Sequence, residues 1–154
     1  KGGGTYYNAV ALPLNVTNLG TLYDLVFTTN AYDERDEEVE TGSMGKVSLL
    51  FPPQLRRAAA QAVESEYLPG VNTNDINALY KACQLIEWGF LRGNATTWYL
   101  GIPKQGITFY HRGAPKIRLF RDEDSGAYKA SNRARLGWMF WNYRFWGGSN
   151  VPLT

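Results

Sequence analysis

One short segment near the end of the sequence constrains the fold more than any other. Residues 136–148 (the aromatic segment) hold three of the five tryptophans, two of the seven phenylalanines and one of the ten tyrosines. A ring of this size removes roughly 150–250 Å² of surface from water when it is covered. The aromatic segment must therefore either anchor a core or present a large apolar face to a partner.

Alternation along residues 136–146 predicts an extended strand with two apolar faces. One face is wholly apolar and comprises Met139, Trp141, Tyr143 and Phe145. We expect that face to pack against helices. The opposite face carries Trp138, Arg144 and Trp146, which we expect to contact a neighbouring subunit or strand. A strand that is apolar on both faces needs cover on both sides, so part of the aromatic segment should belong to the core.

Length and composition indicate one domain. The chain has 154 residues, of which 44% are apolar, as is usual for a single globular core. We expect residues 1–154 to form a single domain, with the glycine-rich residues 1–4 as a flexible tail. No apolar run reaches the roughly 18–20 residues of a membrane span. The sequence therefore predicts no membrane-spanning segment.

Two features bear on where the chain folds. Its single cysteine, Cys83, cannot form an internal disulfide, so the fold does not require an oxidising compartment. The sequence opens with Lys1 instead of methionine, which is typical of a processed product or a polyprotein fragment. We expect a virion or the cytoplasm as the location.

The hydrophobic pattern predicts an α+β fold, a β-rich domain of antiparallel strands with two helices inserted mid-chain. The helices are expected at about residues 53–67, entered at Pro53, and 74–88, capped by Thr73 or Asn74. The expected strands cover residues 10–16, 22–28, 46–51, 96–100, 106–111, 116–120 and 136–146. The first two strands, which flank a turn-forming cluster, should form a hairpin.

No residue set identifies a reaction. Cys83 lies on the apolar stripe of the helix predicted over residues 74–88, where a cysteine acts as a small buried hydrophobe. A Ser125, His111 and Asp122 arrangement can be drawn, but any chain of this size permits one. A single histidine and a single cysteine cannot build a zinc pattern. We therefore predict no catalytic residues, no cofactor and no metal site.

Charge is divided unevenly along the chain. Residues 1–103 contain seven Lys/Arg and eleven Asp/Glu, whereas residues 104–154 contain nine and three. The basic part interleaves cations with aromatic rings, a mixture that single-stranded nucleic-acid sites use for backbone attraction and base stacking. The charges of an ordinary solvated surface give the same composition. The division also allows the acidic end of one subunit to attract the basic end of another.

The basic part supplies the candidate interaction surface. Lys116 and Arg118 should share one strand face, with Ile117 and Leu119 on the other. This pattern suits a nucleic-acid contact, and it also fits any half-exposed strand. The candidate surface comprises Trp138, Arg144, Trp146, Arg133, Arg135 and Tyr128.

These observations favour a non-enzymatic structural protein that assembles with copies of itself or with companion subunits, and a viral capsid or coat component is the favoured hypothesis. Interfaces are enriched in the residue types of the aromatic segment. Residues 143–149 resemble an aromatic, glycine-containing strand of the capsid β-barrels of picorna-like viruses, but Gly147 stands where that pattern has arginine.

One alternative is a monomeric module that binds single-stranded nucleic acid or carbohydrate through the C-terminal region. Another is a small hydrolase that uses His111.

Overall fold

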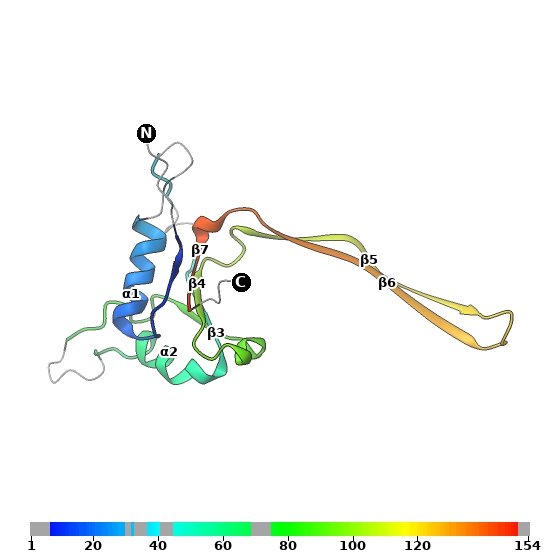
Figure 1. Cartoon of the computed structure of the whole chain (residues 1–154), viewed down its shortest axis with the longest axis horizontal. Coiled ribbons are helices and arrows are strands. Elements are labelled where there is room, and N and C mark those ends of the chain that lie inside the picture. The colour runs from blue at the N-terminus through cyan, green and yellow to red at the C-terminus, as the bar shows by residue number, and fades with distance from the viewer. Residues whose placement is uncertain (1–6, 30–31, 33–36, 41–44, 69–74, 151–154) are drawn as a thin grey trace. The chain divides into compact units, whose positions relative to one another are not determined.

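The computed structural model describes residues 7–29, 32, 37–40, 45–68 and 75–150. Contacts divide the chain into two compact units (Figure 1). The body comprises Lys1–Gly106 with Asn142–Thr154, and the hairpin unit comprises Ile107–Trp141. The tail predicted at residues 1–4 lies outside the described residues.

A five-stranded mixed sheet forms the centre of the body. In sheet order the strands are β1 (Ala9–Val10), β7 (Trp146–Ser149), β4 (Trp98–Gly101), β2 (Ser48–Phe51) and β3 (Gln84–Glu87). β4 runs antiparallel to both of its neighbours, whereas the edge strands β1 and β3 run parallel to β7 and β2. The strands predicted over residues 46–51 and 96–100 therefore lie side by side within the sheet.

A helix forms where the sequence predicted the first hairpin. α1 (Val16–Asp24) continues into a π-helical turn, η1 (Leu25–Thr29). The Asn15 side chain caps α1 by accepting a hydrogen bond of 2.7 Å from the Asn18 N–H. This bond satisfies one of the amides that a helix start leaves without an internal partner.

The hairpin predicted from residues 10–16 and 22–28 is wrong because the apolar residues follow a helical period. Leu19, Leu22 and Val26 recur at spacings of three and four, and all three are fully buried. The predicted hairpin would place Leu19 in an exposed turn, where it could not be buried together with Leu22 and Val26.

The first of the two predicted mid-chain helices is confirmed over part of its length. A 3-10 turn, η2 (Pro53–Leu55), leads into α2 (Arg56–Val63). Pro53 stands at the first helical position, where its missing N–H costs nothing. Ala59, Ala62 and Val63 are buried in the core. α2 thus ends before residue 67, the predicted limit.

The second predicted helix, residues 74–88, is wrong across the part of it that the structure describes. Ile76 pairs with Tyr67 in an isolated bridge and is 77% exposed. Asn77 is buried, and its side-chain amide donates to the Ala62 and Ser65 carbonyls at 2.9 Å each. Lys81 has a left-handed φ of 55°, which an α-helix does not contain. Residues 84–87 form β3, because pairing with β2 satisfies their backbone groups.

The aromatic segment is divided between the two units, so the single strand predicted over residues 136–146 is also wrong. Asn142 caps a 3-10 turn, η4 (Tyr143–Phe145), by accepting a 3.0 Å hydrogen bond from the Arg144 N–H. Of the face expected to pack on helices, only Phe145 is buried. The three exposed members are Met139, Trp141 and Tyr143. The alternation could not be extended through η4, because a 3-10 turn breaks the two-residue period.

Core packing in the body centres on Trp98 of β4, which is fully buried and donates its indole N–H to the Leu12 carbonyl at 3.1 Å. Trp146 packs at the edge of this core and donates to the Gln105 carbonyl at 2.9 Å. A Cβ at Gly101 would lie within 3 Å of the Trp146 ring, so glycine is needed there. A short 3-10 helix, η3 (Gly89–Gly93), links β3 to β4.

The hairpin unit consists of β5 (Ile107–Arg121) and β6 (Tyr128–Phe140), which pair antiparallel around a turn. The strands predicted over residues 106–111 and 116–120 are therefore parts of one strand. With two α-helices and seven strands among the described residues, the fold is α+β and β-rich, as predicted.

Replacing Gly147 by alanine should destabilise the body, because the new Cβ would overlap the Val26 side chain and lie 3.1 Å from Leu22. Overpacking of this kind lowers the free energy of unfolding by about 1–3 kcal/mol, measured by urea denaturation. Gly93→Ala is the control, since no atom lies within 4 Å of its Cβ position. An equal loss of stability in both variants would contradict this account of the packing of α1 on β7.

Candidate interaction surface on the hairpin unit

The register of the hairpin unit assigns its side chains to two faces. Residues directly opposite each other in an antiparallel pair point to the same face, and the face alternates along each strand. Phe109 lies opposite Trp138, and Leu119 lies opposite Ala130. Because the positions of Trp138 and Ala130 on β6 differ by an even number, both pairs lie on one face.

Two irregularities in β5 preserve this division. The register shifts between His111 and Gly113, and again between Gly113 and Lys116, while β6 continues without interruption. Each shift adds one residue to β5, and a single extra residue would turn all later side chains over. Two shifts cancel, so Ile117 returns to the face of Phe109. Pro115, which has no N–H for the ladder, lies within the second shift.

The apolar face is continuous along the hairpin unit. Its large members are Ile107, Phe109, Ile117, Leu119, Tyr128, Leu136, Trp138 and Phe140. Their exposed fractions range from 38% for Ile107 to 84% for Tyr128, and Trp138 is 74% exposed. His111 and Arg121 also lie on this face by register. The hairpin unit therefore presents a row of large apolar side chains with little cover.

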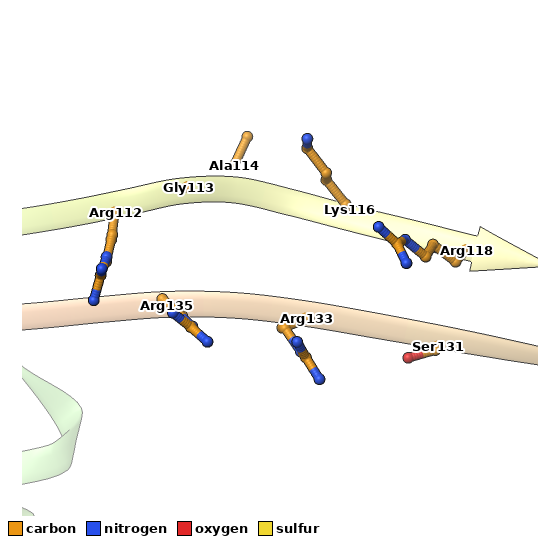
Figure 2. A pocket seen from close by; sticks show the side chains of 8 residues that line it. All are labelled: Arg112, Gly113, Ala114, Lys116, Arg118, Ser131, Arg133 and Arg135. Carbon is orange, nitrogen blue, oxygen red and sulfur yellow. The ribbon is translucent and has the colours of Figure 1, made fainter.

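The basic face lies on the opposite side of the same ribbon. Its central residues line a hollow of about 350 Å³ and are Arg112, Gly113, Ala114, Lys116, Arg118, Ser131, Arg133 and Arg135 (Figure 2). The cations come from both strands, and Lys116 is directly opposite Arg133. Tyr110 and Phe120 lie on this face on either side of the cationic group. The alternation predicted at residues 116–120 is thus confirmed, with Lys116 and Arg118 on one face and Ile117 and Leu119 on the other.

Carboxylates of the hairpin unit are confined to its turn. β5 and β6 contain seven Lys/Arg and no Asp or Glu. The three acidic residues of the hairpin unit lie in the turn between these strands and are Asp122, Glu123 and Asp124. The Asp122 carboxylate accepts hydrogen bonds from Lys129 at 2.5 Å and from Ser125 at 2.6 Å. These two donors, Lys129 first, lower the pKa of Asp122 below its usual value. The turn is thus locally paired, while the basic face is not neutralised by acids of its own strands.

The structure separates the six predicted surface residues into three places. Trp138 and Tyr128 lie on the apolar face, whereas Arg133 and Arg135 lie on the basic face. Arg144 and Trp146 belong to the body, where the Arg144 guanidinium donates to the Tyr32 carbonyl and lies over the Tyr143 ring.

The sequence did not predict that the candidate surface residues of the hairpin unit lie on two different faces. Treating residues 106–111 and 116–120 as separate strands hid the fact that both lie opposite one uninterrupted strand. The signal was present in β6, where small or apolar residues alternate with Arg133 and Arg135.

The arrangement drawn for hydrolysis is not assembled. Ser125 and Asp122 are bonded to each other at the turn, whereas His111 pairs with Leu136 about 30 Å away along the strands. Cys83 is buried in the body, as the sequence predicted. It lies in a bend directly before β3 and not on a helix. Within the described ranges, no group of three or more His, Cys, Asp or Glu residues could hold a metal ion.

Comparison of the chain with protein-family models, with curated proteins and with solved structures finds no match. None of the helices in the described part of the chain is both long and apolar enough to cross a membrane.

Burial raises the pKa of the Cys83 thiol from 9.0 to about 11. We expect Cys83 to react slowly with a thiol reagent near neutral pH in the folded protein and rapidly after unfolding in urea. Because the pKa of Cys83 is higher in the folded than in the unfolded chain, its ionisation favours the unfolded chain. The contribution of Cys83 to the free energy of unfolding is therefore fully present below pH 9 and is lost as the pH rises toward 11. Cys83→Ala should lack this loss of stability, and fast labelling of the folded protein would contradict the buried site.

Proposed function

We propose that this chain is a non-enzymatic structural protein that associates with other copies of itself through the apolar face of the hairpin unit. Its role would be that of a subunit in a coat or shell, with a viral capsid or coat as the favoured setting. The observation that carries the proposal is the row of exposed aromatic and aliphatic side chains on one face of β5 and β6.

The size of the apolar face supports a protein partner. At the exposed fractions of Phe109, Tyr128, Trp138 and Phe140, these four rings alone present roughly 500 Å². The aliphatic members of the face add to that area. Monomeric proteins seldom expose apolar patches larger than about 300–600 Å², and a stable interface covers about 800 Å² on each partner. The apolar face therefore has the size of an interface.

The hairpin unit also lacks a layer of its own. An isolated two-stranded hairpin is at best marginally stable in water, because it has no second layer to cover an apolar face. β5 and β6 pair only with each other, and almost every residue of both strands is exposed. A partner that covers the apolar face would supply this missing layer.

Charge supports a second copy as the partner. The hairpin unit carries seven Lys/Arg and three Asp/Glu, whereas the body carries nine and eleven. The body also exposes an aromatic pair, Trp88 and Phe90, directly after the edge strand β3, with ring centroids 6.2 Å apart. Phe90 is 90% exposed. One chain therefore offers both a basic, apolar ribbon and an acidic body with exposed rings of its own.

The test is association of the purified chain across a wide concentration range, measured by sedimentation velocity. The wild type should form oligomers, and Phe109→Ser with Trp138→Ser should shift the midpoint of association to at least tenfold higher concentration, because two anchors of the apolar face are lost. The matched control, Tyr110→Ser with Met139→Ser, alters the opposite face and should retain association. A wild type that stays monomeric throughout, or a control that dissociates equally, would refute the proposal.

A further inference from the structure

We infer that the basic face of the hairpin unit is a binding site for the phosphate backbone of single-stranded nucleic acid. The site consists of the five cations Arg112, Lys116, Arg118, Arg133 and Arg135, around the hollow shown in Figure 2. It lies on the face opposite the proposed contact between subunits, so the inference does not depend on that proposal.

The charges on the basic face favour an anionic ligand. Lys116 and Arg133 are directly opposed across the ladder, and like charges in this position destabilise a sheet. Arg118 and Arg135 are their neighbours on the same face, about 7 Å further along the strands. No acid stands on β5 or β6 to offset them. An anion that bridges several of these cations would remove the repulsion, which makes a polyanion the ligand best suited to the site.

The residue types of the site indicate which anion it suits. Four of the five cations are arginines, whose planar guanidinium groups bind phosphate oxygens in pairs, and the Ser131 hydroxyl in the same hollow can donate to a further oxygen. The cations are distributed along two extended strands instead of around one point. This spacing suits a chain of phosphates better than a single phosphate group.

Two exposed rings beside the cations favour a single strand over a duplex. Tyr110 and Phe120 flank the cations on the basic face, and their rings are 53% and 49% exposed. Gly137 stands opposite Tyr110, and no atom lies within 4 Å of its Cβ position. Tyr110 therefore has no side chain directly opposite it across the ladder, and the exposed part of its ring is accessible to a base. Unpaired bases can stack on such rings, whereas the bases of a duplex are already stacked on each other.

The experiment measures fluorescence anisotropy of a labelled oligouridylate as a function of salt. If all five cations contact phosphates, the logarithm of the association constant should fall with the logarithm of salt concentration with a slope of about −3.5. Arg133→Gln with Arg135→Gln should weaken binding and make the slope less steep by about 1.4. The control, Arg57→Gln with Arg92→Gln, removes the same charge from the body and should leave both quantities unchanged.

A second pair of variants tests the aromatic rings. Tyr110→Ala and Phe120→Ala should each lower the affinity about fivefold or more without changing the salt slope, because a stacking contact is lost and no charge is removed. Wild-type binding to the duplex of the same length should be weaker than binding to the single strand. Tighter binding to the duplex would overturn the assignment to single strands.

Measurements on the wild type test the nucleic-acid site even where a variant fails to fold. Polyglutamate should compete poorly with oligouridylate for the wild type, and equal competition would assign the basic face to an acidic protein segment instead. Absence of salt-dependent binding by the wild type would overturn the site altogether. The Arg133→Gln and Arg135→Gln double variant keeps the apolar face intact and should still form oligomers in sedimentation, which separates a failure of this site from a failure of the proposed association.

Discussion

The two faces of the hairpin unit depend on a single constraint, the pairing of β5 with β6. Side chains alternate along each strand, so the register decides which of them are neighbours. Two one-residue shifts between His111 and Lys116 cancel, so the odd-numbered residues of β5 lie on the apolar face both before the shifts, at 107–111, and after them, at 117–121. With one shift instead of two, Ile117 and Leu119 would lie among the arginines. The separation of apolar from cationic side chains is thus a property of backbone geometry as much as of composition.

The sequence allowed prediction of those elements whose side-chain period is uninterrupted. The alternation at residues 116–120 correctly separated Lys116 and Arg118 from Ile117 and Leu119. It failed for the aromatic segment, because η4 breaks the period between Phe140 and Trp146. Helix and strand were confused at α1, where β-branched and aromatic residues favoured a strand locally while burial of Leu19, Leu22 and Val26 on one stripe favours a helix. Tertiary packing outweighed local propensity there.

The candidate surface was predictable in kind but not in arrangement. Aromatic and cationic residues are concentrated in the C-terminal part, and that concentration is visible in the sequence alone. Which of them act together depends on contacts between residues far apart in the chain, such as Lys116 with Arg133. Arg144 and Trp146 were grouped with the hairpin residues because they are near in sequence, yet both make their contacts within the body. Proximity along the chain is a poor guide wherever a segment passes from one unit to another.

If the two faces have the roles proposed above, they should differ in their response to salt. Association through the apolar face should not be weakened by screening, whereas attraction between the five cations and phosphates should fall as counterions compete. Association through the apolar face would also place several basic faces in one particle. A nucleic-acid strand that spans them would then bind each further site at a high effective concentration. Assembly would therefore strengthen phosphate contacts that each chain makes separately, and the geometry of one hairpin would couple the two events.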